Sequence, residues 1–273
     1  MQTPPPLTDR PALLCRRRRF SATFLHEVVA VEIKERLAEV NRTFTTPAIV
    51  TGLPIFWRGH WPEAAIVPDD EVLALQTGAH DLVIHALSLH WANDPVGQLV
   101  QCRHALRPDG LLIAVLFGGQ TLHQLRSALA EAETRVTGGL SPRVAPMGEI
   151  RDLGGLLQRA GFALPVADAM PLTVSYAGLT PLMHDLRAMG EANALAARLR
   201  RPTRGGVFAL AETIYRTVFG TPDGRIPATF DIVTLTGWAP APDQQQPQRP
   251  GSATHRLADV LQPEAAPNQR KGD

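Results

Sequence analysis

The sequence has few cysteines, no long apolar run and almost no net charge, and each absence excludes a class of protein. Only Cys15 and Cys102 are present, with no CxxC pair and no Cys/His cluster at metal spacing, so neither a disulfide scaffold nor a metal site is expected. No stretch reaches the roughly 18 apolar residues of a membrane-spanning helix. The 27 basic and 26 acidic residues leave a formal charge of +1, which provides no long-range attraction to nucleic acid.

The amino-terminal part of the chain carries a basic run. Arg16–Arg19 precede an apolar segment that His26, Glu27 and Glu32 interrupt, whereas the core of a secretory signal peptide is continuously apolar. We therefore expect a cytoplasmic protein rather than a secreted one. The basic run indicates at most a peripheral contact with an anionic membrane surface.

The remaining composition predicts one large domain with flanking segments. Hydrophobic residues make up 44% of the 273 positions, enough to bury a sizeable core. Apolar side chains recur at three- and four-residue steps from Leu25 to Val40, which predicts an amphipathic helix within an N-terminal helical segment, residues 1–45. Residues 46–238 are predicted as the main domain, with a helical insertion around 178–220. The Pro- and Gln-rich residues 239–273 are predicted to be a disordered or peripheral tail.

Two continuous apolar runs predict buried strands. Residues 80–89 are apolar apart from Asp81, the histidines and Ser88, and residues 111–117 are wholly apolar, as expected for parallel strands covered on both faces. Between them, Asn93, Asp94 and Pro95 begin a helical segment with a capping side chain followed by proline. Because strands and helices alternate in this way, the sequence predicts an α/β fold with a parallel sheet and right-handed crossovers.

Several of these segments resemble a known superfamily. Residues 81–95, 107–110 and 116–119 are similar to the second half of class I S-adenosylmethionine-dependent methyltransferases. A more specific resemblance is to the respiratory complex I assembly hydroxylases, the mitochondrial assembly factor 5 group and its bacterial relatives. It covers most of the chain and is carried by Leu87–Trp91, Leu116–Arg126, Gly138–Pro142, Asp152–Gly161 and Met189–Asn193.

The resemblance implies a Rossmann-like class I methyltransferase fold and the hydroxylation of a protein arginine during assembly of complex I, the NADH:quinone oxidoreductase. It also implies S-adenosylmethionine as a cofactor and a peripheral-arm subunit of complex I as substrate or partner. Methylation of an unidentified substrate is a second enzymatic interpretation. The alternative is a catalytically inactive protein that keeps the fold and binds an assembly intermediate.

The sequence departs from the superfamily at the loop that holds the cofactor. That loop is glycine-rich because glycine lets the backbone approach the ligand closely, yet Gly52 is the one glycine in the turn that directly follows the first predicted strand. Sixteen residues separate Gly52 from Asp69, too few for a full crossover helix and strand. Pro54, Gly59 and Pro62 are predicted to break any helix there. We therefore expect a first βαβ unit that is partly truncated.

Candidate cofactor contacts remain around this unit. Alignment by neighbouring residues matches Asp69–Glu71 to the acidic turn near the adenine in relatives, rather than to the acid that binds the ribose. The segment that ends the second predicted strand, residues 86–88, is the other candidate. The predicted cofactor-binding residues are Gly52, Asp69, Asp70, Ala86, Leu87 and Ser88.

His90 and Trp91 are the candidate catalytic residues. They follow a buried strand, and in open parallel sheets ligands bind beyond the carboxyl ends of the strands. The alternative is a packed tryptophan beside a histidine that is hydrogen-bonded to a loop. Gly118 and Gly119 are candidate substrate contacts through their backbone, or simply a tight turn. Glu191 is a candidate carboxylate for a substrate arginine, or a solvated charge.

Overall fold

The structure, a computed structural model, describes residues 5–244 of the chain. Of the described residues, 5–241 form one compact unit. Most of the tail predicted over 239–273 lies outside the described residues. No helix within residues 5–244 has both the length and the apolar character of a membrane span.

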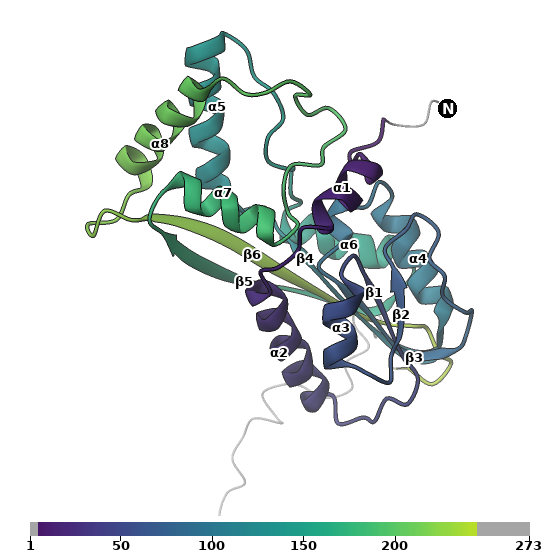
Figure 1. The fold of residues 1–273 in the computed structure, drawn as a ribbon. Coiled ribbons are helices and arrows are strands. Elements are labelled where there is room, and N and C mark those ends of the chain that lie inside the picture. Colours follow the sequence, from purple (N-terminus) through teal and green to yellow (C-terminus); the bar gives the residue numbers. More distant parts are fainter. Residues whose placement is uncertain (1–4, 245–273) are drawn as a thin grey trace, which may run out of the picture. The chain divides into compact units, whose positions relative to one another are not determined.

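A six-stranded mixed sheet forms the centre of this unit (Figure 1). The strand order is β2-β1-β3-β4-β6-β5, in which the first four strands are parallel and β6 is antiparallel to both β4 and β5. The predicted Rossmann-like α/β fold is thus confirmed. The strands are β1 (Pro47–Thr51), β2 (Ala65–Pro68), β3 (His80–Ala86), β4 (Leu106–Phe117), β5 (Ala163–Tyr176) and β6 (Ile226–Trp238).

Helices cover both faces of the sheet, because alternate side chains of each central strand point to opposite faces. From β4, Ile113 and Val115 join one core while Leu112 and Ala114 join the other. The first core is completed by α2 (Phe24–Glu39), α3 (Pro54–His60), α5 (His123–Thr137), α7 (Leu179–Ala188) and α8 (Gly205–Phe219). The second is completed by α4 (Pro95–Ala105) and α6 (Ile150–Arg159).

The first βαβ unit is short, as the spacing predicted. Helix α3 has seven residues and β2 has four. Residues 69–79 then lead to β3 without a helix or strand. In the doubly wound order 3-2-1-4-5-6, a third strand lies at the sheet edge next to the second. In the described residues β2 is itself that edge strand, and no further strand lies beyond it.

The prediction that prolines and glycine would break any helix after Gly52 is wrong. Pro54 occupies the first turn of α3, where its missing N–H costs no intrahelical hydrogen bond. Gly59 lies in the last turn, and Pro62 follows the end of the helix. The predicted limits of the N-terminal segment and of the insertion stay predictions, with α7 and α8 lying inside residues 178–220.

Candidate functional site

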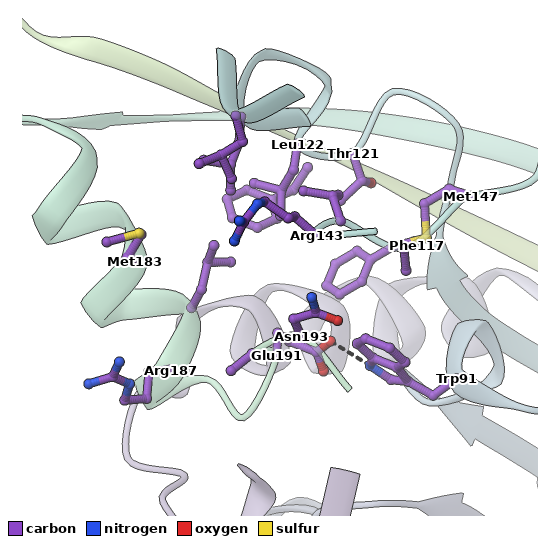
Figure 2. A pocket seen from close by; sticks show the side chains of 17 residues that line it. Trp91, Phe117, Thr121, Leu122, Arg143, Met147, Met183, Arg187, Glu191 and Asn193 are labelled. Carbon is purple, nitrogen blue, oxygen red and sulfur yellow. Dashed lines mark hydrogen bonds between the residues drawn. The ribbon is translucent and has the colours of Figure 1, made fainter. Parts of the chain in front are cut away.

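A cavity of about 210 Å³ opens beyond the carboxyl ends of the central strands. Its walls come from the ends of β4 and η1 (Leu89–Trp91), from α5, α7 and β6, and from the segments before α6 and after α7 (Figure 2). Most of the lining is apolar, including Phe117, Leu125, Met183 and Phe230. The polar lining residues are Thr121, Arg143, Arg187, Glu191 and Asn193.

Glu191 places a carboxylate against this apolar cavity. The Trp91 Nε1–H donates a hydrogen bond of 2.7 Å to Glu191 Oε2 (Figure 2), and His90 Nε2 lies 3.2 Å from the same oxygen. Burial by itself would raise the pKa of Glu191, but His90, Arg17 and the Trp91 hydrogen bond lower it below its usual value. Glu191 is therefore ionised at neutral pH, and its orientation is fixed by two aromatic side chains.

The structure thus brings together three of the predicted residues, His90, Trp91 and Glu191. The His90 ring lies with its centroid 4.7 Å from that of Phe117, and its Nδ1 is buried without a hydrogen-bond partner. The structure agrees in part with both interpretations of His90 and Trp91. The two side chains are packed, as the structural interpretation expects, and they also contact a carboxylate that lines the cavity, as the catalytic one expects. Their catalytic role stays a prediction.

Gly118 and Gly119 do not line the cavity. The Gly118 N–H donates a 2.7 Å hydrogen bond to the Asp231 carbonyl, so this donor is already used. A Cβ at Gly118 would lie 2.5 Å from Val233 Cγ2, and one at Gly119 would lie 2.6 Å from Glu149 Oε1. These contacts describe a tight turn between strand and helix.

Replacing Gly118 by Ala is expected to lower the free energy of unfolding by about 1–3 kcal/mol, because the new methyl group overlaps Val233 and Asp231. Urea denaturation measures the effect. Gly59→Ala is the matched control, since a Cβ there meets nothing within 4 Å and alanine favours the helix by up to about 1 kcal/mol. Equal stability changes in the two variants would contradict the predicted close contact.

Asp69 occupies a second buried position at the same edge of the sheet. It directly follows β2, the neighbour of β1, which is the place of the ribose-binding acid in a dinucleotide-binding fold. The alignment-based prediction placed this turn near the adenine. The structure puts Asp69 directly after β2, which pairs with β1, and its contact with a cofactor stays a prediction.

Two arginines of α1 (Arg10–Arg17) hold the Asp69 carboxylate. Arg17 Nη1 donates to both carboxylate oxygens at 2.8 and 2.9 Å, and Arg10 donates to them at 3.2 and 3.3 Å. Burial alone would raise the pKa of Asp69, but the charges and hydrogen bonds of Arg17 and Arg10 lower it to about 2. The Asp70 side chain is largely exposed, and its carboxylate pairs with Arg10 at 3.3 Å.

The guanidinium of Arg17 also fills the space above Gly52. A Cβ built at Gly52 would lie 2.1 Å from Arg17 Cζ. The absence of a side chain at Gly52 therefore makes room for Arg17 of the same chain. S-adenosylmethionine needs both this space and an available acid. In this arrangement the residues present do not fit the cofactor.

The other predicted cofactor contacts are also buried. Ala86, Leu87 and Ser88 are at most 2% exposed. The Leu87 N–H donates to the Val115 carbonyl, and Ser88 Oγ lies 3.4 Å from His85 Nδ1. His85 Nε2 in turn contacts Gln98 Oε1 at 2.9 Å, while Gln98 Nε2 donates to the Asp69 and Asp70 carbonyls. This chain of contacts fixes the acidic turn to the end of β3.

Comparison with known proteins decides the family. Residues 14–114 match a methyltransferase domain model. A zebrafish protein (Danio rerio) named arginine-hydroxylase NDUFAF5, mitochondrial, is 37% identical over 230 residues, covering 84% of this chain and 71% of that protein. The chain belongs to the arginine-hydroxylase NDUFAF5 family. The predicted relationship to the complex I assembly hydroxylases and to class I methyltransferases is confirmed.

Other NDUFAF5 relatives are longer than this chain. The mouse and human proteins of that name are 42% and 40% identical over 193 residues, which cover 71% of this chain and 56% of each of theirs. The chain thus spans little more than half the length of these curated relatives. Among solved structures, a putative methyltransferase of Bacillus halodurans matches with a TM-score of 0.49 and 14% identity over 76% of this chain and 98% of that one.

The predicted cytoplasmic location is wrong. The NDUFAF5 relatives from zebrafish, mouse and human are all named as mitochondrial. The prediction rested on the scarcity of cysteines and on the interrupted apolar segment after Arg16–Arg19. These features argue only against a disulfide-rich or secreted protein and do not distinguish the cytoplasm from the mitochondrion.

Sequence reasoning missed the arginines that surround the acidic side chains. Arg17 was placed in a surface basic run, yet it is 7% exposed. A usable signal is its helical spacing, since Arg17 lies four residues after Leu13 and the two form the buried side of α1. Arg143 and Arg187, which line the cavity, carry no such local signal.

Proposed function

We propose that this chain binds a protein arginine in the cavity beside Glu191 and takes part in the hydroxylation of that arginine during assembly of respiratory complex I. The observation that carries the proposal is a carboxylate only 12% exposed and ionised, held by Trp91 and His90 at the wall of an apolar cavity. The name of the relatives, arginine-hydroxylase, supports the activity. A peripheral-arm subunit of complex I is the partner that we propose.

The chemistry of arginine matches this arrangement. A guanidinium forms charge-assisted hydrogen bonds with a carboxylate, and its three-carbon stem packs against apolar surface. Trp91 and His90 both contact Glu191 Oε2, so Oε1 can accept from the substrate. In this role, Glu191 orients the guanidinium and Phe117 and Leu125 enclose the stem.

The inactive alternative is not favoured, because the relatives of this chain are named as hydroxylases. A binding role and an enzymatic role share the same cavity. They differ in whether the substrate arginine gains an oxygen atom.

The test uses peptides from peripheral-arm subunits of complex I, each synthesised with arginine and with citrulline, its neutral isostere. Glu191→Gln is expected to weaken arginine-peptide binding by about tenfold or more, because a hydrogen bond to a charged group contributes about 1.5–3 kcal/mol. Calorimetry measures affinity, and mass spectrometry of peptides from cells with and without the protein measures addition of oxygen.

Glu131→Gln is the matched control for this substitution. Glu131 is a half-exposed carboxylate of α5 that pairs with Arg135 outside the cavity, so its loss should leave binding within about twofold. Equal affinity of the wild-type protein for arginine and citrulline peptides would remove the proposal, as would unchanged binding by Glu191→Gln.

A further inference from the structure

Helix α1 lies against both acidic positions of the candidate site. Arg17 contacts Asp69, and its Cα would lie 3.3 Å from a Cβ at Gly190, the residue before Glu191. At the other end of the helix, the Asp9 N–H donates to the Ala194 carbonyl and Arg198 donates to the Asp9 carboxylate. The helix is therefore tied to the segment that follows α7 and to the turn that follows β2.

The place that Arg17 fills is defined by two independent contacts. A Cβ at Gly52 would lie 2.1 Å from the guanidinium carbon, and the same guanidinium bonds both oxygens of Asp69. In a nucleotide-binding α/β fold, the turn after the first strand approaches the ligand and the acid after the second strand accepts from the ribose hydroxyls. Arg17 occupies both positions at once.

The attachment of α1 is mainly polar. Leu13 and Arg17 are the residues of α1 that are buried. Leu13 packs in a small cluster with Trp91, Ala145, Ala194 and Leu195, separate from the cores on the two faces of the sheet. Displacement of α1 would therefore break these ion pairs and the Leu13 cluster while leaving both main cores closed.

We infer that α1 is an internal plug of the nucleotide site, so that an adenosyl ligand binds only after Arg17 withdraws from Gly52 and Asp69. Detachment of the helix removes the guanidinium from the space above Gly52. It also frees the Asp69 carboxylate to accept hydrogen bonds from ribose hydroxyls. This inference goes beyond arginine binding at Glu191 and does not depend on it.

The first test is calorimetric titration of the full chain with S-adenosylhomocysteine. Arg17→Met keeps a flexible stem and removes the guanidinium, and it is expected to bind at least about tenfold more tightly than the wild-type protein, a difference of about 1.4 kcal/mol. Arg18→Met is the matched control, because it removes the same charge from the exposed next position. Affinity of Arg17→Met no higher than that of the wild type, including no binding by either, overturns the inference.

The second test uses the wild-type protein and does not require a stable variant. Hydrogen exchange of the backbone amides of residues 10–17 is measured with and without millimolar S-adenosylhomocysteine. Faster exchange with the ligand is expected, because binding must displace α1. If Arg17→Met does not fold, this measurement decides, and unchanged exchange overturns the inference.

Discussion

Replacing Asp69 by Ala is expected to lower the free energy of unfolding by about 3–5 kcal/mol, because Arg17 would then stay buried without its counter-charge. The side chains of Arg17 and Asp69 are 5% and 2% exposed, so water cannot replace the lost contact. Urea denaturation at neutral pH, with linear extrapolation, measures the change.

Asp70→Ala is the matched control for this prediction. The Asp70 side chain is 56% exposed and makes one ion pair with Arg10, and such surface pairs contribute about 0–1 kcal/mol. The double variant Asp69→Ala with Arg17→Met should recover much of the lost stability, since removing both charges leaves neither unpaired. Equal effects of Asp69→Ala and Asp70→Ala would show that the Arg17 pair is not buried as described.

Acidification from pH 7 to pH 4 is expected to destabilise the protein by about 3 kcal/mol for each of His26 and His85. Burial lowers the pKa of both histidines from 6.5 to about 4, although Glu191 favours the charged form of His26 and the Gln98 hydrogen bond that of His85. Between these two pH values the unfolded chain binds protons that the folded protein does not. Stability is therefore complete above pH 6.5 and is lost as the pH falls toward 4.

Urea denaturation at several pH values measures this slope. His26→Phe is expected to reduce it by about half, because the ring lies among Phe20, Phe56 and Trp57 and a phenyl group does not titrate. His104→Asn, at an exposed position, is the control and should leave the slope unchanged.

Asp69 does not contribute to the loss over this pH range. Its pKa is lowered to about 2, so its contribution is present above its ordinary value of 3.8 and is lost as the pH falls further toward 2. A flat stability profile between pH 7 and pH 4 would contradict the burial of the two histidines as neutral side chains.

The central strands and the long N-terminal helix could be predicted from the sequence. Residues 111–117 are wholly apolar and residues 82–84 and 86–87 are apolar around His85, because both faces of β3 and β4 are covered. The apolar spacing from Leu25 to Val40 marks the buried side of α2 in the same way. The position of His90 and Trp91 near the cavity follows from a general rule, since ligands lie beyond the carboxyl ends of parallel strands.

Local patterns did not predict α3. Pro54 and Gly59 lower helix propensity, yet Trp57 is fully buried in the first core, and tertiary packing of this side chain outweighs the weak local preference. The same packing lets β2 pair directly with β1 and so moves Asp69 next to the first strand.

The α/β class, the order of the central elements and the strand end at which the site forms follow from the sequence, because burial imposes a regular spacing of apolar residues. The family follows from its motifs, such as Leu87–Trp91. Which charges meet depends on the tertiary structure. Glu191 lies one hundred residues after Trp91, and Asp69 lies 52 residues after Arg17. Contacts between residues so far apart leave no local periodicity, since they depend on how separate elements pack, and they determine which carboxylate faces the cavity and which holds an arginine.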